Sequence, residues 1–232
     1  MLTESGTLKA NCSGFNREEW QPRTGNAHKA DSLEAKSAVH DAERQRLEAN
    51  GSRWSSLFSL DYFDPILHHT IDPMHCLYLG IAKTMTKHYL QSGLISQHGL
   101  SQLQNVMDTV RVPQNIGRIP RKIVSGFASF TADQWKNWTL VYSSSALRNI
   151  LPNEHLKVWL KFVHGTSLLT KKILRLEDLE LADSLLVSFC SDVQRLYGEG
   201  FIKPNFHMAC HLVEVIKQFG PVYSFWCYSF ER

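Results

Sequence analysis

Apolar residues recur at intervals of three and four along most of residues 71–220, and no convincing stretch there alternates apolar with polar residues. Intervals of three and four place apolar side chains on one face of a helix, whereas alternation is typical of a strand. The sequence therefore predicts a mainly α fold. The expected helices cover residues 71–91, 96–111, 131–151, 153–173, 177–197 and 205–220.

The helix at 71–91 begins at the sequence Asp72-Pro73, and Asp is a favoured N-cap before a Pro at the first helical position. Asp72 and His75 also place a carboxylate and an imidazole in an otherwise apolar run, which costs free energy unless both groups are paired. By spacing alone, Asp72 is interpreted as the N-cap and His75 as a core histidine with satisfied ring nitrogens.

The chain is expected to divide into three regions. Residues 1–53 form a loose leader with one exposed helix at 27–50, because that stretch favours helix but has few large apolar residues. Residues 54–221 form the helical domain. Residues 222–232 are aromatic and stop one residue after Glu231, so we expect them to be the truncated start of an element that continues in the natural protein.

Composition excludes some classes of protein. A net charge of +3 does not by itself indicate nucleic-acid binding. No apolar run approaches the length of a membrane span, and the N-terminus lacks the pattern of a signal peptide. The five cysteines are scattered and form no C-x-x-C pair, which favours a reduced, intracellular protein with no membrane partner.

Two further groups of polar residues could carry chemistry. His207 and His211 share one helical face; the spacing favours a satisfied pair, and a zinc site that also uses His75 is a weaker alternative because structural zinc takes four ligands. Their role stays open. The loop at 114–130 carries three basic side chains that are either solvated surface or contacts to DNA phosphates, namely Arg118, Arg121 and Lys122.

Five blocks of the sequence resemble, in the same order, blocks of the CACTA (En/Spm-like) DNA transposases, especially copies found in fungi. The most specific block is "YFDPILHHTIDPMHCLYLG", with its DPMH motif, and the last is "PNFHMACHLVEVIKQFGPVYSFWCYSFER". The other three are "SGFNREEWQPRT", "IGRIPRKIVSGFASFTADQWKNWTLVYS" and "LPNEHLKVWLKFV". Together they cover nearly all of residues 12–232.

The resemblance implies an RNase-H-like transposase in which two Asp and one Glu hold two divalent cations, Mg²⁺ or Mn²⁺. A long helical insertion precedes the Glu and carries a C/D-x-x-H signature, which Asp72 and His75 match. Glu231 matches the catalytic, metal-binding Glu. Asp72 and His75 would then organise the site or contact the DNA end, and the two cations would activate the nucleophile and stabilise the leaving oxygen.

The chain also departs from that family. No block matches the two Asp residues, and Asp61 and Asp64 stand in the wrong context to replace them. We therefore expect a transposase fragment that binds no cation alone and has little or no strand-cleaving activity. Its parent would act in the nucleus on transposon ends; self-association stays open. The alternative is a non-catalytic remnant that binds DNA or a protein, in which the basic loop and the pair Trp135 and Trp138 matter more than Glu231.

Overall fold

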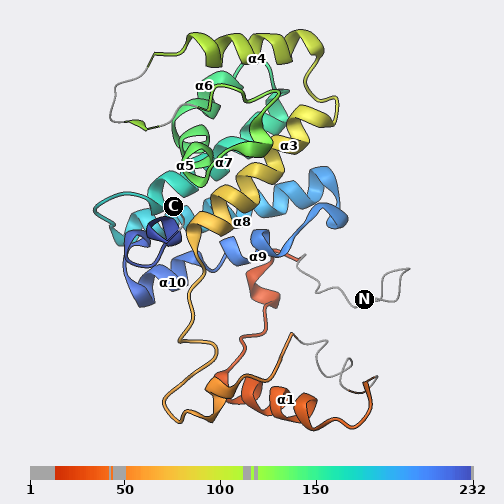
Figure 1. The fold of residues 1–232 in the computed structure, drawn as a ribbon, viewed down its shortest axis with the longest axis vertical. Helices are drawn as coiled ribbons and strands as arrows, with labels where there is room; N and C mark the ends of the chain where they lie inside the picture. Colours follow the sequence, from red (N-terminus) through yellow and green to blue (C-terminus); the bar gives the residue numbers. More distant parts are fainter. Residues whose placement is uncertain (1–13, 42, 44–50, 112–115, 118–119, 231–232) are drawn as a thin grey trace. The chain divides into compact units, whose positions relative to one another are not determined.

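The computed structural model describes residues 14–41, 43, 51–111, 116–117 and 120–230, and Figure 1 shows the fold. The chain divides into two compact units, residues 1–70 and residues 71–232. The described residues form helices, turns and irregular segments but no strand, so the mainly α prediction is confirmed. Among these residues, no helix combines the length and the apolar character needed to span a bilayer.

Among the residues that the structure describes, the first unit has an α-helix that lies in sequence between two short 3₁₀ helices. These elements are η1 (Arg17–Glu19), α1 (Gly25–Ser37) and η2 (Ser56–Ser59). The Thr24 hydroxyl accepts a hydrogen bond from the Ala27 amide at 3.3 Å, which caps the start of α1. Helix α1 ends at Ser37, well before the expected end at 50, and residues 44–50 lie outside the described residues.

An aromatic cluster joins residues 54–70 to α1. The Phe58 ring lies 5.6 Å from His28 of α1, 5.7 Å from Trp54 and 6.2 Å from Phe63, measured between ring centroids. Because these rings pack together, the division between the units lies after Thr70. It does not coincide with the expected boundary between residues 53 and 54.

Asp64 lies in a turn within residues 54–70. Its Oδ1 accepts hydrogen bonds from the amides of Ile66 at 2.7 Å and Leu67 at 2.9 Å. Both hydrogen bonds lower the pKa of the Asp64 carboxyl, and the one from the Leu67 amide has the larger effect on it. The Asp64 carboxylate therefore stabilises the turn at Pro65.

The second unit is a bundle of helices whose bounds follow the predicted segments closely. In the described part of this unit, the segments η3 (Met74–Ala82) and η6 (Trp138–Tyr142) have π-helical hydrogen bonding. The α-helices are α3 (Lys83–Gln91), α4 (Gln97–Thr109), α5 (Ala132–Asn137), α6 (Ser143–Ala146), α7 (Asn153–Leu169), α8 (Leu176–Tyr197), α9 (Pro204–Ala209) and α10 (Leu212–Phe219). Short 3₁₀ turns are η5 (Phe127–Ser129), η7 (Glu199–Phe201), η8 (Val222–Ser224) and η9 (Cys227–Ser229).

Two predicted helices differ from the observed ones. The helix expected at 131–151 has Thr131 as its N-cap, as predicted, but it passes through the π segment η6 and ends at Ala146. The helix expected at 205–220 is interrupted between α9 and α10, because the amides of Cys210 and His211 bond to carbonyls three residues back and tighten the turn.

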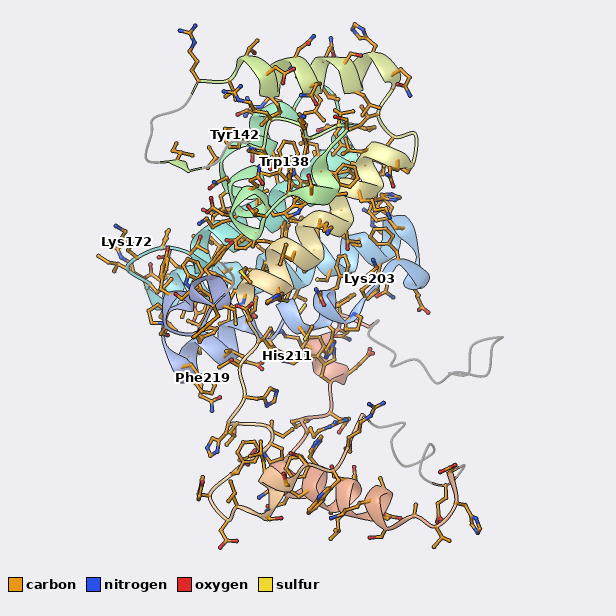
Figure 2. The ribbon with its side chains drawn as sticks, viewed as in Figure 1. Trp138, Tyr142, Lys172, Lys203, His211 and Phe219 are labelled. Atoms are coloured by element: carbon orange, nitrogen blue, oxygen red, sulfur yellow. The ribbon has the colours of Figure 1, made fainter. Side chains whose placement is uncertain are left out.

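The core of the second unit forms around α7 and α8, which lie side by side (Figure 1), and around buried tryptophans. The indole of Trp138 donates to the Thr86 hydroxyl at 2.9 Å, and the indole of Trp159 donates to the Ser143 hydroxyl at 2.9 Å. Trp138 lies among the helices (Figure 2). Trp135 and Trp138 are both fully buried, so the expectation that this pair matters for binding DNA or a protein is wrong: their rings are part of the core.

Helix α9 packs against η3 at a point of close approach between Gly80 and Asn205. A Cβ placed on Gly80 would lie 1.7 Å from Asn205 Nδ2 and 2.8 Å from the His75 carbonyl oxygen. The same Asn205 amide donates to that carbonyl at 3.3 Å, and the Cys76 thiol donates to the Asn205 carbonyl at 3.3 Å. A residue without a side chain at position 80 is therefore required for this contact.

Gly80→Ala should destabilise the protein, although Gly-to-Ala changes inside a helix normally stabilise by about 1 kcal/mol. We expect a loss of about 1–3 kcal/mol in the free energy of unfolding, because the methyl group must displace Asn205. Urea denaturation measures the change. Asn205→Ala combined with G80A should cost less than the sum of the two single changes.

Gly200→Ala is the matched control, because no heavy atom lies within 4 Å of a Cβ at that position. Its free energy of unfolding should change by less than about 0.5 kcal/mol. A stabilising effect of G80A would show that η3 and α9 do not approach in this way.

Candidate functional site

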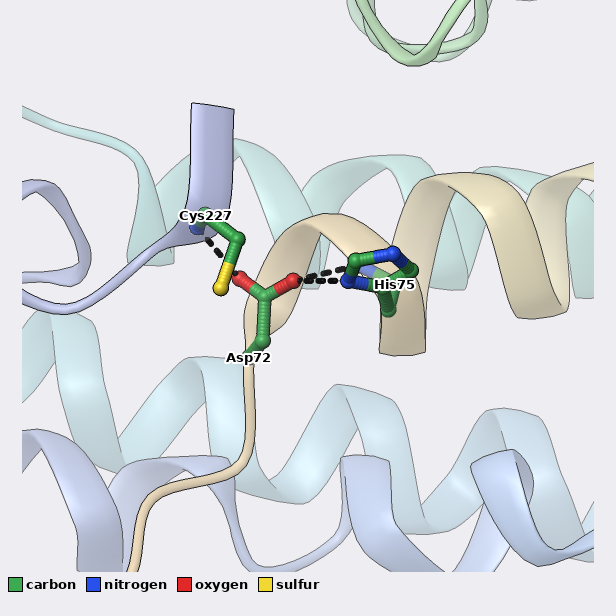
Figure 3. A group of neighbouring side chains, drawn as sticks. All are labelled: Asp72, His75 and Cys227. Carbon is green, nitrogen blue, oxygen red and sulfur yellow. Dashed lines mark hydrogen bonds and ion pairs between the residues drawn. The ribbon is translucent and has the colours of Figure 1, made fainter. Parts of the chain in front are cut away.

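The Asp72 carboxylate joins the start of one helix to a segment near the C-terminal end of the chain. Its Oδ1 accepts from the Met74 amide at 3.2 Å and from the Cys227 amide at 2.9 Å. Its Oδ2 accepts from the His75 amide at 3.1 Å and meets His75 Nδ1 at 2.5 Å (Figure 3). The predicted N-cap is confirmed, and the carboxylate also holds a residue 155 positions away.

His75 lies at the surface, so its interpretation as a core histidine is wrong. Its side chain is 49% exposed, against 14% for Asp72. The neighbouring positions Met74 and Leu77 take the buried face of the helix, which turns position 75 outward. Because Nδ1 faces a carboxylate, it carries the proton, and Figure 3 shows the other ring nitrogen turned away from Asp72 and Cys227.

An imidazole held in this way presents its Nε2 to an incoming ligand. The ring orientation is set by Asp72 Oδ2, as a carboxylate orients the imidazole in many acid–base sites. In the neutral ring Nε2 accepts a proton, and in the charged ring it donates to an anion such as a phosphate. The geometry thus suits proton transfer or phosphate contact at His75.

Asp72, His75 and Cys227 are also close enough to hold a metal ion, since one ligand atom from each lies within 4.8 Å of the others. A thiolate in the set favours a soft ion such as Zn²⁺ over Mg²⁺. Both carboxylate oxygens of Asp72 already accept hydrogen bonds. An ion would therefore have to displace the imidazole from Asp72, and the hydrogen-bonded arrangement is complete without one.

No other trio of His, Cys, Asp or Glu in the described part of the chain meets that distance criterion. His75, His207 and His211 thus do not gather into one site, and the weaker zinc alternative is wrong. The two histidines of α9 and its following turn instead pair with each other, with Nε2 atoms 3.2 Å apart.

The pair extends to a carboxylate. His211 Nδ1 lies 2.9 Å from Glu214 Oε2, so His211 donates there and its Nε2 accepts the Nε2–H of His207. Burial, followed by the charge of His211, lowers the pKa of His207. The pairing of the two histidines predicted from the spacing is therefore observed, with Glu214 as a third member.

Aromatic packing fixes the segment that carries Cys227. The Tyr228 ring lies 6.4 Å from Tyr78 of η3, and its hydroxyl donates to the Ala132 carbonyl of α5 at 3.2 Å. Burial raises the pKa of the Tyr228 hydroxyl strongly. Lys136 of α5 lies 4.9 Å from the Tyr228 ring centroid, a cation–π distance. The segment up to residue 230 is thus held beside Asp72, while Glu231 lies outside the described residues.

One residue of the basic loop, Arg121, has a structural role. The Arg121 guanidinium donates to the carbonyls of Met107 at 3.3 Å and Asp108 at 2.7 Å, where it satisfies the C-terminal end of α4. Lys122 is exposed, and Arg118 lies outside the described residues. Of the three side chains predicted to contact DNA, Arg121 is held by the protein itself.

Sequence reasoning missed two members of this region, Cys227 and Asn205. Nothing in the sequence marks Cys227, because its role is played by a backbone amide that any residue except proline provides. Asn205 had a signal: Gly80 interrupts a strongly helical run, and an isolated glycine there often marks close approach of another segment.

Comparison of the chain with protein-family models, with curated proteins and with solved structures finds no match. The basis for a functional assignment is therefore the geometry around Asp72 together with the block-by-block resemblance of the sequence.

Asp72→Ala should lower the free energy of unfolding by about 2–3 kcal/mol, because the helix loses its cap and the Cys227 amide loses its acceptor. His75→Ala should cost less than about 1 kcal/mol, since a half-exposed ion pair contributes little. Urea denaturation of both variants measures the difference. Equal losses would show that the imidazole, and not the link to Cys227, carries the stability.

The free energy of unfolding should fall as pH decreases below about 6.5, the ordinary pKa of histidine. His207 has a lowered pKa when folded, so the unfolded chain binds more protons in that range and is favoured there. His207→Gln should make the fall shallower without removing it, because burial also lowers the pKa of His28 and His88.

Denaturation between pH 7.5 and 5 measures this slope. His98→Gln, at an exposed position of α4, is the control and should retain the slope of the parent. If H207Q retained it too, the His207–His211 pair would not contribute to the acid sensitivity.

Proposed function

We propose that this chain is the helical insertion, and the adjoining Glu-bearing segment, of a DDE-type DNA transposase of the CACTA kind. The intact protein would cut and rejoin DNA at transposon ends in the nucleus. In this proposal Glu231 is one ligand of the catalytic cations, and Asp72 and His75 position the DNA end.

The observation that carries the proposal is the hydrogen bond between the Asp72 carboxylate and the Cys227 amide. It joins the DPMH motif to the segment directly before Glu231, although the two are 155 positions apart. The resemblance requires these two blocks to serve one site. The helical structure of residues 73–219, with no strand among those described, supports the expected helical insertion.

The described residues do not form a two-cation centre. Mg²⁺ and Mn²⁺ prefer several oxygen ligands, and Asp72 is the carboxylate that meets the distance criterion, with both of its oxygens already accepting hydrogen bonds. We therefore assign no catalytic step to ions at Asp72. Its role is to orient the His75 imidazole, and the role of His75 is to contact a phosphate or move a proton at the DNA end.

The reading frame at the genomic locus tests this proposal directly. We expect in-frame segments with the two missing Asp residues before this chain and terminal repeats around the gene. Protein from the extended frame should cleave DNA that carries those repeats in Mg²⁺ or Mn²⁺. Glu231→Gln should reduce cleavage by more than about 100-fold, because even outer-shell partners of a metal contribute about 10–100-fold.

Glu180→Gln, at an exposed carboxylate of α8, is the matched control and should cleave like the parent. His75→Ala should weaken binding of the DNA end while leaving the unfolding transition nearly unchanged. Cleavage that is indifferent to E231Q would contradict the site. DNA binding without any cleavage by the extended protein would favour the non-catalytic remnant instead.

A further inference from the structure

A groove runs beside α3 in the second unit. The described residues that line it lie at 79–92 and 200–206, outside the basic loop. One hollow of about 670 Å³ is lined by α3 and by the segment of residues 200–203. A second hollow of about 310 Å³ is lined by residues 79–84 and 203–206. The two share Leu79, Thr84 and Lys203, so they adjoin and form one groove.

Lysines dominate the charge of this groove. Lys83 and Lys87 are four residues apart, and so project from one face of α3, while Lys203 comes from the segment before α9 (Figure 2). Among the residues that the structure describes, no Asp or Glu lines either hollow. None of the three lysines forms an ion pair among the described residues. Three uncompensated ammonium groups on two walls favour an anion between them.

Aromatic rings lie between these charges. The ring centroids of Phe201 and His88 are 4.9 Å apart in an edge-to-face arrangement, and both residues are partly exposed in the first hollow. Burial, followed by the charge of His155, lowers the pKa of His88, so its imidazole is neutral at pH 7. The groove therefore combines cationic walls with neutral ring surfaces, the combination that binds single-stranded nucleic acid.

The groove continues toward the candidate site. Asn205 lines the second hollow, and its amide donates to the His75 carbonyl at 3.3 Å. Helix η3–α3 carries His75 at its start and the two lysines farther along. A strand whose phosphates contact the lysines would thus lead toward the first turn of that helix.

We propose that the groove formed by Lys83, Lys87 and Lys203 binds the phosphate backbone of single-stranded DNA, with Phe201 stacking against a base. The choice of DNA among phosphate ligands rests on the proposed function. Hollows of this size, with ring surfaces inside, fit one strand, because a duplex keeps its bases stacked away from such rings.

Binding of a fluorescein-labelled single-stranded oligodeoxynucleotide to the full 232-residue chain tests the inference by fluorescence anisotropy at 50–200 mM salt. The triple variant K83A/K87A/K203A should bind at least about tenfold more weakly. Its slope of log affinity against log salt should be shallower by about 2, because each phosphate contact on a single strand contributes about 0.7. Phe201→Ala should weaken binding about tenfold with the slope unchanged.

The matched control is K157A/K172A/K217A, which removes the same charge from three exposed lysines outside the groove. Equal weakening by the two triple variants would overturn the inference, because it would show binding to net charge alone. Tighter, lysine-independent binding of the duplex would also overturn it, as would full competition by inorganic pyrophosphate, which would indicate a small-anion pocket.

Circular dichroism of each variant shows whether it is folded, and the partial or full exposure of the three lysines leads us to expect unchanged unfolding. The two proposals fail separately. Loss of the groove's effect leaves cleavage by the extended protein and its dependence on Glu231 intact. A locus without the missing Asp segments leaves single-strand binding by the groove to be explained by a remnant that binds DNA.

Discussion

The second unit depends on one carboxylate that satisfies donors from two ends of its sequence. Asp72 accepts from the first turn of the helix it caps and from the amide of Cys227. A free helix start has amides that need partners, and a chain segment after the last long helix has amides that need partners too. One side chain meets both needs and also orients His75 toward solvent. Structure and candidate chemistry therefore share a single residue.

Packing around that carboxylate explains why the surrounding elements are irregular. The helix runs as a π segment from Met74 to Ala82 before it becomes α-helical, and π segments are uncommon and frequent at functional sites. Helix α9 crosses this segment closely enough to require Gly80. Tyr228 closes the other side against Tyr78. The site is built from short, specialised pieces, whereas α7 and α8 supply the regular core.

Much of the fold could be predicted from periodicity, because apolar spacing follows the helix wherever a helix has one buried face. The capped start at Asp72 and the capping box at Thr131 depend on residues within three positions of each other, so they can be recognised in the sequence. The exposure of His75 was open to prediction, because position 75 lies outside the apolar face that includes Met74 and Leu77. Cys227 could not be predicted, because its contribution is a backbone group. The burial of Trp135 and Trp138 could be predicted from their helical spacing. The alternative of a binding remnant did not take that spacing into account.

The contact between Gly80 and Asn205 has a consequence for how this sequence can diverge. A side chain gained at position 80 takes the space of the Asn205 amide, and that amide bonds the carbonyl of His75. A substitution at position 80 is therefore coupled to a substitution at position 205. Relatives that keep His75 in place should vary at these two positions together or not at all. Substitutions near the DPMH motif are therefore constrained in part by α9, a helix that begins more than a hundred residues later.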